Sequence, residues 1–314
     1  MKQEIKQFGK TVLSSDHSGP GGLGLFFANM TGKNKRGWEY WAFVENWVLQ
    51  QGFELGPVEL WEDGRLLKRL VCPERRCIMA NIETPADMKA FYEKFTALAR
   101  YQDDSKIFDD LLTFIIDLFS FDNPWKPEGR YDDPEIRMRF FELFQEIVLL
   151  MKMKVKDDGA WYDPFGSLYE LQIASKARRE KSAQFFTPAC VVDLMTMMNA
   201  GLRELTGKGE MFSDPTCGSG RNLIAMHSKF PGNYCCGEDI DRTCVLMTIC
   251  NFILHGVNGE VIWHDSLQPD AEHFFGAWRV CPRPELMGCP QVSKMKWEDT
   301  LCYAVWQGRL EEHQ

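Results

Sequence analysis

The sequence has no C-x-x-C pair, no long apolar run and no excess of positive charge, and each absence excludes a class of protein. The 11 cysteines are scattered, so the ligand spacing of a zinc ribbon is missing. No apolar run approaches the roughly 20 residues that a membrane span needs, and the first residues lack the apolar core of a secretory signal. These absences predict a cytoplasmic protein with reduced thiols, no metal site and no membrane partner.

Positive charge is scarce, with 36 Lys and Arg against 45 Asp and Glu and a net charge of −9. A uniformly basic nucleic-acid coat is therefore excluded, whereas a local basic stripe is not. Two basic segments could contact phosphates: residues 176–181, and the cluster of Lys33, Lys35 and Arg36. The alternative interpretation is that both are ordinary charged surfaces exposed to solvent. The 314 residues are 45% hydrophobic, which allows a sizeable core and about two domains.

The N-terminal half is expected to be mainly helical. Apolar residues recur at helical spacing in residues 103–118 and 132–149, each time behind a cluster of acids that is typical of a helix start. Three further elements are expected on similar grounds: a helix at residues 38–51, a hairpin around Asp63-Gly64 and a helix at residues 84–101.

The polar stretch at residues 156–159 ends this helical pattern. We therefore predict a boundary there, with a helical region at residues 1–158 and a second domain at residues 159–314. After a short helical segment at residues 167–181, strands and helices alternate, which predicts a parallel sheet. The expected strands are residues 211–213, 234–237 and 260–263, and the expected helices between them are residues 219–229 and 241–255.

A glycine turn follows the first of these strands. In Asp214-Pro-Thr-Cys-Gly-Ser-Gly220, the small residues let the backbone approach a ligand closely at the start of a helix. The next residues begin with Arg221, so the third glycine of a dinucleotide fingerprint is absent. An acid just before the glycines disfavours a phosphate and suits a cationic ligand such as S-adenosylmethionine, which carries an ammonium and a sulfonium.

Acidic residues also mark the ends of the next two strands, with Asp239 after the second and Asp265 after the third. Open α/β sheets bind ligands at the carboxyl ends of their strands, where a carboxylate can accept hydrogen bonds from ribose hydroxyls or from an adenine amine. Any one of these acids alone is more typical of a helix cap or a turn. The ordered set of three, together with the glycine turn, predicts a binding site.

Several segments in this order resemble the N6-adenine DNA methylase family, which includes the modification subunits of type I restriction–modification systems. The resemblance covers about residues 159–268. The segments that carry it are Asp163-Pro-Phe-Gly-Ser-Leu-Tyr-Glu170, Ala183-Gln-Phe-Phe-Thr-Pro188, Asp214-Pro-Thr-Cys-Gly-Ser-Gly220, Gly237-Glu-Asp-Ile-Asp241, Asn251-Phe-Ile-Leu-His-Gly256 and Asp265-Ser-Leu267.

The resemblance implies an α/β fold in which the helical region precedes a Rossmann-like, class I methyltransferase domain that binds S-adenosyl-L-methionine. The methionine end of the cofactor would be bordered by Phe186, Thr187 and Pro188, and its amino-acid portion would be lined by Asp214, Gly218 and Gly220. The ribose would be held by Asp239, with Ile240 beside the adenine and Asp265 at the adenine amine. Thr187 also suits the N-cap of the helix that follows.

The catalytic motif of the family is missing from its expected place. In the family, Asn/Asp-Pro-Pro-aromatic ends the fourth strand, where it accepts hydrogen bonds from the adenine amine and stacks on the flipped base. No such motif follows Asp265, and the remaining residues are too few for about four more strands with their crossovers. The domain is therefore expected to be shortened at its C-terminal side, and its catalytic residues stay unknown.

An upstream segment, Asp122-Asn123-Pro124-Trp125, loosely resembles the missing motif, as in a circularly permuted methyltransferase. Asn123 stands where the first proline would be, and a helix ended by Asn-Pro is the alternative interpretation. Under either interpretation, the usual position of the motif, downstream of the cofactor motifs, stays empty.

Two functions from different classes remain. The first is S-adenosylmethionine-dependent methylation of adenine N6 in DNA in a restriction–modification context. The second is a catalytically degenerate relative that serves as a DNA- or protein-binding module. The expected partners are DNA and a specificity or restriction subunit, which could supply target recognition. A methyltransferase of small molecules is a weaker rival, because no residue specifies such a substrate.

Overall fold

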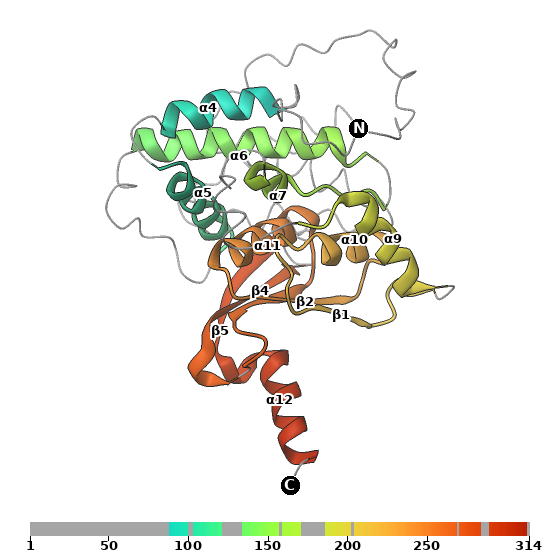
Figure 1. Ribbon diagram of the computed structural model, residues 1–314. Helices are drawn as coiled ribbons and strands as arrows, with labels where there is room; N and C mark the ends of the chain where they lie inside the picture. Colours follow the sequence, from blue (N-terminus) through green and yellow to red (C-terminus); the bar gives the residue numbers. More distant parts are fainter. Residues whose placement is uncertain are drawn as a thin grey trace, which may run out of the picture.

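The computed structural model describes residues 88–99, 103–120, 134–156, 159–170, 186–201, 204–268, 270–283 and 289–312. These residues form layers, with helices stacked above a sheet and one helix below it (Figure 1). Several predicted features lie outside the described residues: the elements at residues 38–51 and 63–64, the helix start at residues 84–87, both basic segments, Gln184 with Phe185, and Asp122 to Trp125.

The upper layer consists of α4 (Lys89–Ala99), α5 (Asp104–Leu118), α6 (Pro134–Lys154) and the short α7 (Pro164–Leu168). The helical prediction is confirmed where the structure describes it. Asp103 begins α5 as expected, because its side chain accepts a hydrogen bond from the backbone N–H of Ser105 at 2.9 Å.

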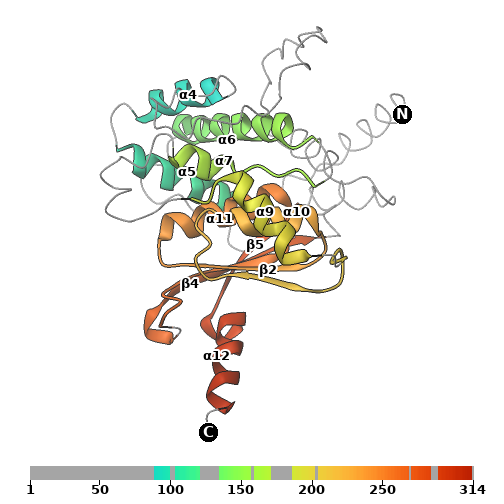
Figure 2. The same ribbon diagram turned by 45° about the vertical axis from the view of Figure 1, so that its right-hand side comes forward.

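The sheet contains β1 (Met211–Asp214), β2 (Tyr234–Asp239), β3 (Gly259–His264), β4 (Phe274–Arg283) and β5 (Cys289–Met295), in that spatial order. The first three strands are parallel, as predicted, and are connected by α10 (Arg221–Lys229) and α11 (Arg242–His255). Both connecting helices lie on one face of the sheet, together with α9 (Ala189–Ala200) (Figure 2).

The sheet continues beyond the three predicted strands with two strands that were not predicted, and these two do not extend the parallel arrangement. β4 is antiparallel to β3, and β5 is antiparallel to β4. The strand order runs in one direction, so the described strands contain no reversal of the kind at which doubly wound sheets bind ligands. The face opposite α10 and α11 carries the short η6 (Trp297–Asp299) and the first turn of α12 (Leu301–Glu312), and the rest of α12 extends away from the sheet (Figure 1).

One helix explains how the upper layer and the sheet hold together. In α11 every residue from Cys244 to Leu254 is buried, because the helix has the sheet on one side and the upper helices on the other. Thr243 Oγ1 donates to Asp109 of α5 at 2.8 Å. The hydrophobic core therefore continues across the predicted boundary at residues 158–159, and the division into two domains stays a prediction.

Two partly buried histidines, His227 of α10 and His255 of α11, predict a loss of stability in mild acid. Burial, and to a lesser degree the neighbouring His255, lowers the pKa of His227 from 6.5 to about 4, and burial lowers the pKa of His255 as well. Between these pKa values the unfolded chain binds more protons than the folded one, so the free energy of unfolding falls as the pH drops from about 6.5 toward 4.

We expect His227→Gln to reduce this pH dependence. The measurement is urea unfolding of wild type and variant at about pH 7.5 and about pH 5, where the variant should lose less stability between the two values. Burial raises the pKa of Asp117 to about 6, which gives the opposite slope, but both proteins carry this residue and the comparison cancels it. An unchanged pH dependence in His227→Gln would show that His227 does not titrate on unfolding.

Candidate functional site

The glycine turn lies between β1 and α10, as predicted. Gly218 and Gly220 have φ of +58° and +82°, in the left-handed region that favours glycine. A Cβ on Gly218 would lie 3.1 Å from the ring of Phe186, and a Cβ on Gly220 would lie 2.9 Å from Cγ2 of Thr248. Both the backbone conformation and the close neighbours therefore require the absence of a side chain at these two positions.

The three strand-end acids lie at the same edge of the sheet, because β1, β2 and β3 are parallel neighbours. Asp239 contacts the glycine turn directly, since its Oδ2 accepts the N–H of Gly218 at 2.9 Å and its Oδ1 accepts the N–H of Asp241 at 2.9 Å. Burial raises the pKa of Asp239, and the two backbone hydrogen bonds oppose this shift.

Asp214 and Asp265 hold their own loops. Asp214 accepts from the N–H of Thr216 at 3.2 Å and from Nδ2 of Asn222 at 3.0 Å. Asp265 accepts from the N–H of Leu267 at 3.0 Å and from Nε2 of Gln268 at 3.1 Å. The two loops touch, because Ser266 Oγ donates to the carbonyl of Pro215 at 2.7 Å. Each predicted acid thus has a local structural role in addition to its place at the edge.

The segment before α9, which includes Phe186 and Thr187, lies against the glycine turn. The ring of Phe186 is 5.7 Å from that of Tyr169 and 5.3 Å from the guanidinium carbon of Arg221. The carbonyl of Thr187 accepts from Nη1 of Arg221 at 3.1 Å. The prediction that Thr187 caps α9 is wrong, because Pro188 occupies the N-cap position and provides no side-chain hydrogen bond. Proline fixes the extended backbone that leads into the helix.

Large apolar side chains are exposed beside the strand-end acids. The exposed fractions are 61% for Ile240 and 91% for Leu267. The carbonyl of Ile240 accepts from Nε1 of Trp263 at 3.0 Å, and this indole is 5.2 Å from the ring of Phe275. Exposed apolar groups beside polar ones are typical of a surface that binds a ligand or a partner.

A buried polar network behind the glycine turn was not predicted from the sequence. Asp163 is 2% exposed, and its carboxylate accepts four hydrogen bonds. The donors are the N–H of Gly166 at 2.7 Å, Ser219 Oγ at 2.6 Å, Arg221 Nε at 2.6 Å and Asn251 Nδ2 at 2.7 Å. Because Ser219 lies between the two glycines of the turn, this network fixes the turn from behind.

Arg221 connects this network to the segment before α9. Its Nη2 also donates to Glu170 at 2.8 Å. Burial lowers the pKa of Arg221, but the carboxylates of Asp163 and Glu170 outweigh it and raise the pKa overall. The partners lie 51 and 58 positions apart in sequence, so no spacing rule indicated them. Asp163, Glu170 and Asn251 lie in segments that carry the family resemblance, and the capping pattern at Asp163-Pro164 is a further local signal.

The glycine turn and the acid that contacts it therefore lie together at the carboxyl edge of three parallel strands in a domain of the α/β class. Residues 160–285 match the family model described as N-6 DNA Methylase, and this confirms the resemblance that the motifs predicted. The match concerns that segment and not the whole chain, and it shows similarity to the N6-adenine DNA methylase family. Residues 2–71 match a domain of unknown function, DUF7688, and lie outside the described residues.

Searches of curated proteins and of solved structures gave no match to this chain. None of the helices that the structure describes has the length and apolar character needed to cross a lipid bilayer.

Proposed function

We propose that the domain binds S-adenosyl-L-methionine at the carboxyl edge of β1, β2 and β3, in a Rossmann-like arrangement, and acts on adenine N6 in DNA. The observation that carries this proposal is the glycine turn, whose left-handed Gly218 and Gly220 bring the backbone at the start of α10 to this edge, where the N–H of Gly218 donates to Asp239 at 2.9 Å. The bound cofactor would supply the methyl group. Phe186, Thr187 and Pro188 would border its methionine end, and Asp214 would face its positive charge.

Asp239 is the residue best placed to hold the ribose. It ends the middle of the three parallel strands and is already fixed by the N–H groups of Gly218 and Asp241. A carboxylate has about four acceptor sites, so two remain for a pair of hydroxyls. Ile240 would cover the adenine and Asp265 would accept from its amine, which would remove the apolar surface of Ile240 from water.

We expect calorimetry to detect binding of S-adenosylmethionine to the full chain and a weaker affinity for Asp239→Asn. Hydrogen bonds to a charged group contribute about 1.5–3 kcal/mol, so the dissociation constant should rise roughly 10- to 100-fold. Asp104→Asn, at an exposed site on α5, is the control and should bind as wild type does. No heat of binding at millimolar ligand would remove the cofactor from the proposal.

A second candidate function is a catalytically degenerate relative that binds DNA or a protein. It is favoured by the direction of β4, which is antiparallel to β3 and therefore ends, at Arg283, at the opposite edge of the sheet from Asp239. A motif at the carboxyl end of this strand would lie far from the proposed cofactor. The 314 residues also contain no Pro-Pro pair.

Methyl transfer to mixed-sequence DNA separates the two candidates. The full chain is assayed alone and with the subunits of a restriction–modification complex, since we propose that such a partner supplies target recognition. Robust formation of N6-methyladenine by the chain alone excludes the second candidate. Cofactor binding without transfer under either condition favours it.

A further inference from the structure

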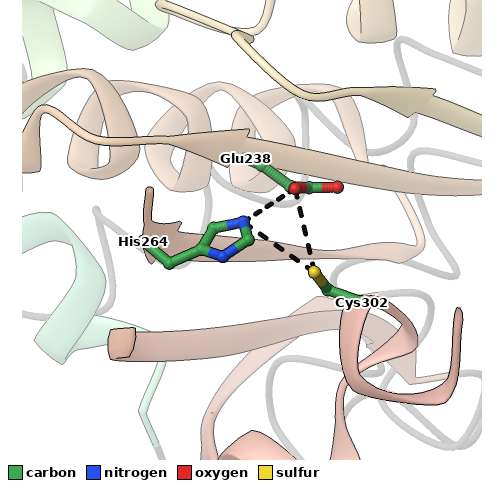
Figure 3. A group of neighbouring side chains, drawn as sticks. All are labelled: Glu238, His264 and Cys302. Atoms are coloured by element: carbon green, nitrogen blue, oxygen red, sulfur yellow. Dashed lines mark hydrogen bonds and ion pairs between the residues drawn. The ribbon is translucent and has the colours of Figure 1, made fainter. Parts of the chain in front are cut away.

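Three side chains of different chemistry meet on the face of the sheet opposite α10 and α11. Side chains alternate along a strand, so Glu238 and His264 project from the face opposite their neighbours Asp239 and Asp265. The third residue, Cys302, is in the first turn of α12, which begins over this face (Figure 3). The group therefore draws on β2, β3 and α12.

The candidate ligand atoms are close enough to share one ion. Glu238 Oε2 is 2.7 Å from His264 Nε2, and Cys302 Sγ is 4.0 Å from each of them. In a tetrahedral zinc site with ordinary bond lengths, such atoms lie about 3.4–3.6 Å apart. Movements of about 0.5–0.7 Å would convert one arrangement into the other. Figure 3 shows the three groups pointing toward one another.

The burial and the chemistry of the three side chains are compatible with a bound cation. His264 is fully buried, and the Glu238 side chain is only 12% exposed, so a buried carboxylate faces an imidazole. Cys302 is partly exposed, which leaves solvent access for a fourth ligand. Thiolate, imidazole and carboxylate are the ligand types that zinc takes in proteins.

The position of Cys302 does not depend on an ion. Glu260, which is fully buried on the same face, accepts the N–H of Leu301 at 2.7 Å and the hydroxyl of Tyr234 at 2.8 Å. The hydrogen bond to Leu301 fixes the start of α12. Each of the two partners contacts a different carboxylate oxygen of Glu260. The thiol of Cys302 is therefore held beside Glu238 and His264 before any ion binds.

We propose that Glu238, His264 and Cys302 bind a single zinc-class divalent cation, with solvent as the fourth ligand. The thiol of Cys302 loses its proton to become a thiolate ligand, and Nε2 of His264 coordinates as the unprotonated nitrogen. Nδ1 of His264, which has no hydrogen-bond partner among the described residues, then carries the ring proton. The ion joins α12 to β2 and β3. This site is separate from the proposed cofactor edge and does not rest on it.

Cobalt(II) is the probe, because a thiolate bound to cobalt gives a charge-transfer band and a tetrahedral site gives strong visible bands. The full chain, treated with chelator and kept reduced, is titrated with cobalt and then with zinc. We expect one equivalent of cobalt to give both signals and zinc to remove them. Cys302→Ser should abolish the charge-transfer band, whereas Cys190→Ser, at an exposed thiol on α9, should retain it.

Glu238→Gln provides a variant that is expected to keep its fold. The amide can still hydrogen-bond to His264, and circular dichroism checks the structure, but the anionic ligand is lost. We expect its cobalt affinity to fall at least about tenfold. The proposal is overturned if wild type shows no thiolate–cobalt band, or if Cys302→Ser retains the band of wild type, because another thiol would then hold the ion.

Discussion

Asp163→Asn is expected to lower the free energy of unfolding by about 3–5 kcal/mol, the cost of breaking a buried ion pair from one side. The carboxylate is buried and accepts from four donors, among them Nε of Arg221 at 2.6 Å. An amide of the same size would present its NH₂ group to donors, and the guanidinium of Arg221 would keep only one carboxylate partner, Glu170, whose side chain is 36% exposed. Urea unfolding, followed by circular dichroism, measures the loss.

The matched control for this prediction is Asp104→Asn, which makes the same chemical change at an exposed position. Its effect should stay within about 1 kcal/mol, since it alters only a charge in the first turn of a helix. If Asp163→Asn lost no more stability than this control, the charge of Asp163 would not be what holds the glycine turn.

Gly166→Ala is expected to destabilise the protein by about 1–3 kcal/mol through overpacking of the same network. A Cβ on Gly166 would lie 2.0 Å from Oδ2 of Asp163 and 2.5 Å from Oγ of Ser219. Neither atom can move aside freely, because they are hydrogen-bonded to each other at 2.6 Å. Thermal unfolding measures the change as a lower midpoint temperature.

Gly308→Ala is the control, because it makes the same substitution at a helical glycine that has open space around it. No heavy atom lies within 4 Å of a Cβ placed on Gly308. Alanine stabilises a helix interior by about 0.5–1 kcal/mol relative to glycine, so this variant should unfold at a slightly higher temperature. A Gly166→Ala protein as stable as wild type would mean that the Asp163 network rearranges without cost.

The βαβ part of the fold could be predicted from sequence because its signals are local. Each parallel strand is a short apolar run followed by an acid, and each helix begins beside a recognisable turn, so the predicted and observed bounds of α10 and α11 differ by at most two residues. The glycine turn was predictable for the same reason: its conformation is determined by Gly218 and Gly220 themselves.

β4 and β5 were not predicted, because their composition hides the strand pattern. β4 includes Gly276 and Pro282, which are depleted in strands, and Pro282 pairs with Pro290 of β5. The residues after Asp265 therefore gave no indication that the chain forms a strand antiparallel to β3. Pairing with the already formed edge of β3 determines these strands, and such pairing is a tertiary effect.

The networks around the candidate sites were unpredictable for a different reason. Asp163 and Asn251 are 88 positions apart, and Cys302 lies 64 positions from Glu238. Nothing in the local sequence indicates that these side chains meet. Their contacts arise only when α11 packs behind the glycine turn and α12 begins over the opposite face of the sheet.

The outer strands of the sheet bear on how readily it could pair with a strand of another chain. An unpaired strand edge is a template for pairing with another chain. β1 is only four residues long, so it offers a short ladder. On the other side, Pro290 of β5 has no N–H, and the N–H of Val292 donates to the carbonyl of Phe119 at 2.8 Å. Both borders of the sheet therefore resist edge-to-edge aggregation.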